Sequence, residues 1–382
     1  MHYLAVDLLY DFQCMADACP NTCCVGWFIS IDEETHQKMV ENEDRLGVAA
    51  DDWLEKKEKG SLVKMDNGRC PMLNEKNLCN VVLKLGPEYL SNTCTCYPRA
   101  MSQYGSVIEG HFKVSCPEII RALMEKTNVQ FELNEDERPA SPYSHTKLYL
   151  YESAVRNSII SILQRPLDIS LSTRLFVSYN ILDEAIRHYK EKQFDFSMLK
   201  KDIEECMQEE VLFSMNENMY EIIQKKEQYS FLQEFQMVLL NFPEPERFEK
   251  MVQQVTTYFL RNDFEQYLTD MQRFRVCLRQ YDNFYINYWV CRIFSDIIVI
   301  PDYEKARDEF IYITAEFCLF QIVAFVLYIN NGSLDREEYI YVISCVSRQM
   351  EHNSNLHEKL IAQLKENEVA DIVGLLMMTI AS

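Results

Sequence analysis

Cysteine is the residue type in this 382-residue chain whose number and spacing most clearly indicate chemistry. Nine of its fourteen cysteines lie within the first 116 residues. Thiolates bind soft metals, so this density favours zinc, copper(I) or an iron–sulfur cluster over magnesium or calcium. The spacing runs Cys14-x4-Cys19-x3-Cys23-Cys24, then Cys70-x8-Cys79-x14-Cys94-x-Cys96, and ends at Cys116.

The spacing also bears on which metal the thiols hold. Paired CxxC knuckles, typical of closed zinc sites, do not occur, and widely spaced single cysteines suit a cluster held by four thiolates from distant segments. One or two zinc sites and unmetallated thiols are the alternatives. The adjacent Cys23 and Cys24 point in different directions along an extended chain, so we do not expect them to ligate one ion in the same way. The sequence favours an iron–sulfur cluster but does not select its four ligands.

Three other side chains flank the cysteines. Trp27 and Tyr97 are either part of a hydrophobic shell that tunes and shields a cluster, or plain core residues. Arg99 can offer its guanidinium to a carboxylate of a ligand, and an internal salt bridge is the alternative.

The cysteine-rich part must position these residues mostly through loops, because glycine and proline interrupt it often. We predict a helix over residues 33–43 and a short hairpin over residues 107–114. A segment this rich in loops buries little apolar surface by itself, so a bound metal should supply part of its folding free energy.

The rest of the chain is predicted to be helical. Residues 132–144 have the charge, proline and serine content of a linker, so we place a boundary near residue 140, between a metal-binding module (1–140) and a helical domain (141–382). Amphipathic periodicity predicts helices over residues 146–164, 170–192, 198–208, 228–240, 245–270, 284–298, 302–329, 334–350 and 356–365. Ser170, Asp302 and Ser333 are expected as N-caps, and Asn331-Gly332 as a helix end. The fold class is therefore mainly α.

Composition limits the partners and the compartment. A net charge of −21 argues against nucleic acid, whose phosphates need clustered Lys and Arg. Residues 310–329 are long enough to span a membrane, but Glu316 inside them would cost roughly 2.5–3.5 kcal/mol, so we expect a buried helix and no membrane span. The N-terminus has no signal-peptide pattern, which indicates a reducing, cytoplasmic setting.

Taken together, the cysteines and their neighbours resemble the flagellin lysine-N-methylase family, which belongs with proteins that carry a CxxCxxCC metal-chelating domain. The first cysteines depart from that pattern, because their spacings here are x4 and x3. The matching motifs are Phe12-Gln13-Cys14, Cys19-Pro20-Asn21-Thr22-Cys23-Cys24, Gly26-Trp27, Ile31-Asp32, Cys70-Pro71, Leu78-Cys79, Tyr89-Leu90-Ser91-Asn92-Thr93-Cys94, Tyr97-Pro98-Arg99 and Ser115-Cys116-Pro117-Glu118.

The resemblance implies methyl transfer from S-adenosylmethionine to lysine side chains of flagellin, by a protein that carries an iron–sulfur cluster, expected to be 4Fe-4S. It implies cofactor-binding roles for Trp27, Tyr97 and Arg99. Cys96 falls where the family requires no cysteine. The implied metal ligands are Cys14, Cys19, Cys23, Cys24, Cys70, Cys79, Cys94 and Cys116.

The sequence itself limits the mechanism of such a transfer. It contains no GxG, so the glycine-rich loop of a Rossmann-type methyltransferase is missing. A CxxxCxxC motif is missing too, so we expect an unconventional donor site where the two domains meet. The acceptor lysine must be neutral, although its unperturbed pKa is near 10.4. No catalytic base can be chosen, and we interpret Arg348, Glu351 and His352 as a solvated helix face. A non-catalytic iron–sulfur protein and a zinc-stabilised interaction scaffold are the competing hypotheses.

Overall fold

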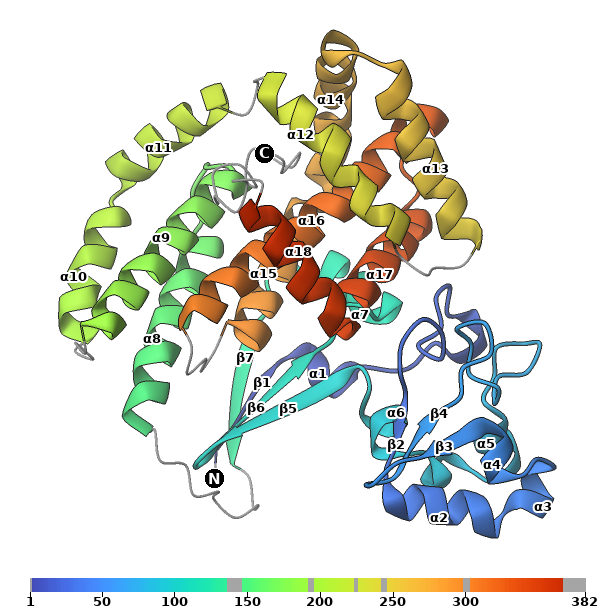
Figure 1. The fold of residues 1–382 in the computed structure, drawn as a ribbon. Coiled ribbons are helices and arrows are strands. Elements are labelled where there is room, and N and C mark those ends of the chain that lie inside the picture. The colour runs from blue at the N-terminus through green and yellow to red at the C-terminus, as the bar shows by residue number, and fades with distance from the viewer. Residues whose placement is uncertain are drawn as a thin grey trace.

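The computed structural model describes residues 2–135, 146–191, 196–222, 226–241, 246–297 and 303–366. The described chain forms a large helical part, a four-stranded sheet beneath it, and a small lobe beside the sheet (Figure 1). The fold is mainly α, as the sequence predicts.

The four-stranded sheet joins the beginning and the end of the cysteine-rich segment. Its order is β5-β6-β1-β7, with β1 parallel to β6 and the other neighbours antiparallel. Its strands are β1 (His2–Val6), β5 (Arg99–Tyr104), β6 (Val107–Phe112) and β7 (Phe131–Glu135). The short helix α1 (Leu8–Asp11) follows β1, and α7 (Pro117–Glu125) follows β6. Both helices bury leucine or isoleucine side chains in the same core as the helical part.

The small lobe carries most of the cysteines on short elements. A three-stranded antiparallel sheet, in the order β2-β4-β3, is packed with five short helices. The elements are β2 (Ser30–Ile31), α2 (Glu33–Glu41), α3 (Glu43–Leu46), α4 (Ala50–Trp53), β3 (Leu54–Lys56), β4 (Ser61–Val63), α5 (Asn80–Lys84) and α6 (Asn92–Cys96). Helix α2 confirms the helix predicted over residues 33–43, and the Asp32 carboxylate caps it by accepting the Thr35 N–H at 2.9 Å.

Helices of the large part wrap around one apolar helix. The other helices surround α16, which is buried throughout its apolar centre (Figure 1). Their bounds are α8 (Thr146–Leu163), α9 (Leu171–Lys190), α10 (Phe196–Cys206), α11 (Glu209–Ile222), α12 (Lys226–Phe235), α13 (Glu246–Arg261), α14 (Phe264–Leu278), α15 (Asp282–Asp296), α16 (Tyr303–Asn331), α17 (Arg336–His352) and α18 (Ser354–Glu366). By length and composition α16 is the one described helix that could cross a membrane, and its apolar stretch lies wholly inside the protein. The prediction of a buried helix is confirmed.

Several predicted boundaries are confirmed. The Ser170 hydroxyl caps α9 by accepting the Thr173 N–H at 3.1 Å. Helix α16 ends at Asn331, where Gly332 has a φ of +73° and donates its N–H to the Tyr328 carbonyl. Such a left-handed residue after a helix favours glycine because it has no Cβ.

Other predicted elements need correction. Residues 107–112 are one strand of a hairpin that begins at Arg99, so residues 107–114 are not a hairpin by themselves. The helix predicted over 245–270 is two helices, because the Asp263 carboxylate accepts the Gln266 N–H and starts α14. Helix α11 was not predicted. Asp335, rather than Ser333, caps α17. Asp302 lies outside the described residues.

The described packing has two hydrophobic cores, and they do not follow a division at residue 140. The larger core joins β1, β6 and α7 to the helices, while the smaller one belongs to the lobe between Ile29 and Leu85. Residue 140 itself lies outside the described residues, so that boundary stays a prediction. However, residues 132–135 of the predicted linker belong to strand β7.

Candidate metal centre and adjoining pocket

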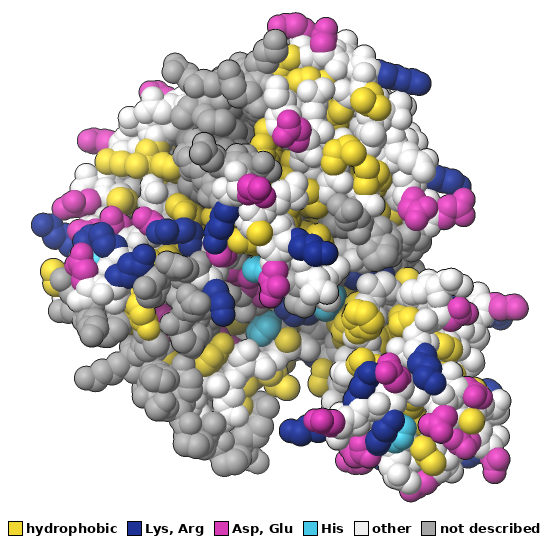
Figure 2. Space-filling model, in the orientation of Figure 1, with side chains coloured by type: hydrophobic (Ala, Val, Ile, Leu, Met, Phe, Trp, Pro, Cys, Tyr) yellow, Lys and Arg dark blue, Asp and Glu magenta, His cyan; other side chains and the backbone are white. Residues whose placement is uncertain are grey.

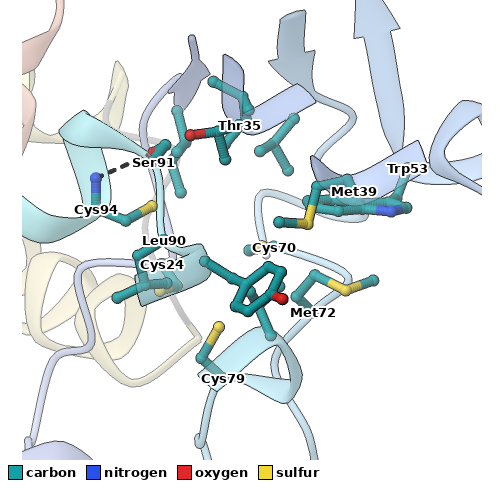
Figure 3. A pocket seen from close by; sticks show the side chains of 15 residues that line it. Cys24, Thr35, Met39, Trp53, Cys70, Met72, Cys79, Leu90, Ser91 and Cys94 are labelled. Carbon is teal, nitrogen blue, oxygen red and sulfur yellow. Dashed lines mark hydrogen bonds between the residues drawn. The ribbon is translucent and has the colours of Figure 1, made fainter. Parts of the chain in front are cut away.

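Four of the predicted ligands line one pocket in the small lobe. Cys24 comes from the loop before β2, Cys70 from the loop after β4, Cys79 from the N-cap of α5, and Cys94 from α6. Figure 3 shows the four side chains around a common space, otherwise lined mainly by apolar groups such as Met39. We call Cys24, Cys70, Cys79 and Cys94 the first thiol group.

Backbone hydrogen bonds fix the loops that carry these thiols. The Cys70 N–H donates to the Cys24 carbonyl at 2.9 Å, which brings together two segments 46 positions apart. Leu73 forms a β-bridge with Cys79, and the Cys94 N–H donates to the Ser91 hydroxyl at 3.2 Å. The lobe therefore holds four distant cysteines side by side through its backbone.

The surroundings of the first group keep most of its thiols protonated until a metal binds. Burial raises the pKa of Cys70 to about 12 and that of Cys94 to about 11. A hydrogen bond from Cys23 instead lowers the pKa of Cys24 to about 7. Burial also raises the pKa of Cys79, although the N–H groups of α5 oppose this effect. A metal that binds here displaces protons, and the amides directed at sulfur then stabilise the thiolate.

The donor set suits a soft metal, and its spacing is wide. No three of the described thiols have sulfur atoms that all lie within 4.8 Å of one another. A tetrahedral zinc ion with Zn–S bonds of ~2.3 Å requires sulfurs ~3.8 Å apart. The first group as it stands is therefore spaced more widely than a single tetrahedral zinc ion requires.

The other four predicted ligands, Cys14, Cys19, Cys23 and Cys116, lie in a separate group. Burial raises the pKa of Cys116 to about 12, and the thiols of Cys19 and Cys14 add to this effect. We call these four residues the second thiol group. The two groups adjoin where the Cys23 thiol hydrogen-bonds to Cys24. Cys96 is exposed at the end of α6.

Two of the three predicted cofactor-binding residues meet a histidine of the helical part. The Trp27 ring lies 4.5 Å from the His352 ring and 5.6 Å from the Tyr97 ring, between centroids. Tyr97 Oη and His352 Nε2 each lie 3.1 Å from the Ser115 hydroxyl. Arg99 is placed elsewhere: it stacks on the Phe12 ring and donates to the Phe12 carbonyl at 3.0 Å. Trp27, Tyr97 and His352 form what we call the aromatic triad.

The interpretation of Arg348, Glu351 and His352 as a solvated helix face is wrong. The Arg348 side chain is only 1% exposed, and it donates to the Asn21 carboxamide oxygen at 2.7 Å and to the Asn21 carbonyl at 2.8 Å. Glu351 accepts the Val114 and Ser115 N–H groups. Helix α17 thus uses these side chains to hold both the small lobe and the strand that leads to Cys116.

Close packing at this contact explains one glycine of the motif. Gly26 has a φ of +85°, and a Cβ at this position would lie 3.1 Å from Cδ of Arg348. A side chain would be strained by the backbone and would also press on the buried arginine. Gly26 therefore lets the loop between Cys24 and Trp27 approach α17.

A second pocket opens beside His352. Figure 2 shows that this face is hollowed where the lobe meets the helical part, with histidine side chains near the middle. The pocket is lined by charged side chains of α15, α16, α17 and α18. Its ionisable residues are Lys113, Arg292, Asp296, Glu309, Glu351, His352, His357 and Glu358. Burial lowers the pKa of His352 to about 4, so its ring is neutral at neutral pH.

Sequence reasoning missed the ion pairs behind this pocket. Arg292 lies 2.6 Å from Glu316 and 2.7 Å from Asp296, and its side chain is 2% exposed. The sequence feature that could have predicted these ion pairs is the presence of charged residues within apolar helical segments, because a buried charge needs a partner. Glu316 was noticed only as an argument against a membrane span.

Comparison with known proteins points to one family. Residues 156–378, more than half of the chain, match the family described as the FliB lysine N-methylase C-terminal domain. A 139-residue match is 33% identical to proteins named lysine-N-methylase from Salmonella typhimurium and Salmonella choleraesuis, over 32% of this chain and 35% of each relative. A 120-residue match is 32% identical to the flagellar biosynthetic protein FliU of Salmonella muenchen, over 30% of this chain and 71% of that protein. The match spans about a third of the length of the first two relatives. No solved structure matches.

Proposed function

The chain belongs to the FliB lysine N-methylase family, and on that premise we propose that it transfers methyl groups from S-adenosylmethionine to lysine side chains of flagellin. The names of the Salmonella relatives support both the reaction and the flagellar substrate. The reaction would take place in the cytoplasm, before flagellin is exported. An iron–sulfur cluster in the small lobe is part of the proposal.

The observation that carries the cluster is the convergence of four thiols on one apolar pocket. Cys24, Cys70, Cys79 and Cys94 would hold it, and their spacing is wider than a single zinc ion requires. When bound, a cluster of this kind supplies an electron-transfer centre and cross-links four segments of the lobe.

The acceptor lysine is assigned to the pocket beside His352. Four carboxylates line this pocket against two permanent cations, Lys113 and Arg292, so it attracts a positively charged side chain. Of the aromatic triad, the His352 ring lines this pocket, and the Trp27 ring packs on it with 4.5 Å between centroids. A neutral His352 ring adds no repulsion.

The chemical step requires the neutral amine. The lysine ammonium must pass its proton to solvent water before its nitrogen lone pair attacks the methyl carbon of the sulfonium. The new N–C bond forms as the S–CH₃ bond breaks, and the electron pair of that bond stays on sulfur. Desolvation in the pocket lowers the pKa of the amine, whereas the carboxylates that attract the ammonium raise it, so desolvation is the effect that favours the neutral form.

The test is mass spectrometry of flagellin after incubation with the anaerobically purified protein and S-adenosylmethionine. We expect added methyl masses on lysines with the wild-type protein and with Cys96→Ser, whose thiol lies in neither group. Cys79→Ser should lose both iron and methylation. A metal-loaded protein that neither binds the donor in calorimetry nor modifies flagellin would instead support a partner-binding role. Stoichiometric zinc without iron or sulfide would support the zinc-stabilised scaffold.

A further inference from the structure

Helices α9 and α10 carry a group of metal-ligating side chains that the proposed function does not use. Glu184 and His188 lie one turn apart on α9, and Asp202 lies on α10, which packs against α9. One ligand atom from each of the three lies within 4.8 Å of the other two. Figure 1 shows α10 on the opposite side of the helical part from the small lobe, so this group is separate from the cysteines of the lobe.

His188 is the member of the group that the fold buries. It is 2% exposed, and its Nε2 lies 3.3 Å from a carboxylate oxygen of Asp202. Within the described chain its Nδ1 has no hydrogen-bond partner, so the ring makes its polar contacts through the Nε2 edge, on the side of the two carboxylates. Imidazole nitrogen is the commonest metal ligand in proteins, and here the burial of the ring fixes its orientation.

The packing of the two helices sets the positions of the three ligands. A spacing of four residues places Glu184 and His188 on one face of α9. Leu199 and Ile203 of α10 are both buried, and Asp202 lies in the turn between them. The apolar contact between the helices therefore holds the Asp202 carboxylate beside the imidazole.

The distances suit a single small ion. A tetrahedral ion with bonds of ~2.0–2.1 Å to nitrogen and oxygen requires ligand atoms ~3.3–3.4 Å apart. The His188 nitrogen and the Asp202 oxygen already have this separation. The Glu184 side chain is 39% exposed, so it can close the remaining distance by a change of rotamer.

The Arg187 guanidinium bridges the two carboxylates in this structure. It lies 2.5 Å from Glu184, 3.7 Å from Asp202 and 3.4 Å from the His188 ring. Its side chain is 51% exposed and lies 3.7 Å from Glu191, so it can move to that partner without loss of buried contacts. A divalent ion would bring two positive charges to the two carboxylates where the guanidinium brings one.

We propose that Glu184, His188 and Asp202 bind a divalent metal ion, and that this ion is zinc. One imidazole nitrogen and two carboxylate oxygens are ligands that zinc accepts, with a water molecule in the fourth position. Zinc also binds such ligands more tightly than manganese does. The bound ion would cross-link α9 and α10 at a distance from the site of methyl transfer.

The test is equilibrium dialysis of the anaerobically purified full chain against zinc ions, with circular dichroism to check the fold. Thiols of the lobe also bind zinc, but they are the same in every variant, so the difference between variants reports on this site. We expect His188→Gln and Asp202→Asn to bind one zinc ion fewer than the wild type, or to bind it at least about tenfold more weakly. Glu205→Gln, 63% exposed on α10, is the matched control and should equal the wild type.

Two further measurements place the ion and test the exchange with Arg187. Zinc should slow hydrogen–deuterium exchange in peptides from α9 and α10 of the wild type, but not of Asp202→Asn. Arg187→Gln removes the competing cation and should tighten zinc binding up to about fivefold. Weaker binding by Arg187→Gln would contradict the exchange of the guanidinium for the ion.

None of these measurements depends on methylation, so the metal site and the proposed function can fail separately. Folded His188→Gln and Asp202→Asn variants that bind as much zinc as the wild type, with the same affinity, would overturn the site. Protection by zinc that is confined to peptides of the small lobe would overturn it too.

Discussion

Two neighbouring residues, Cys23 and Cys24, place their thiols in different groups. Cys24 lines the pocket of the small lobe together with Cys70, Cys79 and Cys94, whereas Cys23 is not among the residues that line it. The Cys23 thiol nevertheless stays next to the pocket, because it hydrogen-bonds to the Cys24 thiol and so lowers the pKa of Cys24.

The partly buried imidazole of His352 should make stability depend on pH. Its pKa is lowered to about 4 by burial, against 6.5 in the unfolded chain. Between these values the unfolded chain binds a proton that the folded protein does not, so the free energy of unfolding falls as the pH falls from 6.5 to 4. The full effect is on the order of 3 kcal/mol. His352→Gln should show a shallower pH dependence than the wild type in urea unfolding at pH 5 and pH 7.

The wild type and His352→Gln have the same thiols. The titration of these thiols therefore contributes equally to the pH dependence of both proteins and does not affect the difference between them. His2→Gln, at an exposed position, is the matched control and should reproduce the wild-type slope. Equal slopes for His352→Gln and the wild type would contradict a neutral, buried His352.

The carboxylates of the pocket should act on substrate affinity. Glu309 lies 3.1 Å from His357 at the pocket edge. Glu309→Gln removes one negative charge, and a partly exposed charge is worth up to about 1 kcal/mol. We expect KM for a lysine-containing flagellin substrate to rise up to about fivefold, with kcat nearly unchanged. Glu34→Gln, in the small lobe, is the control. A loss of kcat at constant KM would indicate that Glu309 acts in the chemical step.

Among the elements, helices were easier to predict than strands, and the reason is physical. Helices such as α9 and α17 show their apolar face in local periodicity. The strands β1 and β7 are short, and β7 is largely exposed, so their pairing depends on partners far along the chain. Residues 132–135 were therefore assigned to a linker.

The site was only partly predictable for a related reason. The eight ligand candidates were found from residue type and spacing, but their separation into two groups depends on which loops meet. Arg348, Glu351 and His352 looked solvated because they are polar residues at a helix end. Arg348 is buried, and Glu351 and His352 are partly buried, because the small lobe and the segment after β6 pack against that end of α17. Such a contact between distant segments leaves no local signal.

Helix α15 is tied to α7 through one buried amide, which allows a test at the scale of elements. Asn287 donates to the carbonyls of Leu123 at 3.1 Å and Lys126 at 2.8 Å, and accepts the Val129 N–H at 2.9 Å. Asn287→Ala leaves these buried groups unpaired, so we expect a loss of about 2–4 kcal/mol in the free energy of unfolding. Asn283→Ala, exposed on the same helix, should change it by less than about 0.5 kcal/mol. Chemical denaturation measures both, and equal effects would contradict this role.

At the scale of the whole molecule, the two cores differ greatly in size. The lobe has twelve buried core residues among those described, and one of them is the predicted ligand Cys70. The larger core includes β1, α7 and nearly all the helices. The contact between them is largely polar, because Arg348 and Gln349 bind backbone and side-chain groups of the loop from Asn21 to Gly26. Such an interface does little to stabilise the lobe by burial.

Removal of metal should therefore unfold the lobe and leave the helices folded. A core of this size offsets little conformational entropy, whereas four thiolate bonds cross-link the loops around Cys24, Cys70, Cys79 and Cys94. Hydrogen–deuterium exchange before and after anaerobic chelation gives the measurement. We expect peptides from residues 54–85 to lose protection and peptides from α15, α16 and α17 to keep it. Chelator saturated with metal is the control. If metal analysis confirms a metal-free protein whose lobe keeps its protection, the twelve-residue core would be sufficient by itself, and the metal would serve chemistry alone.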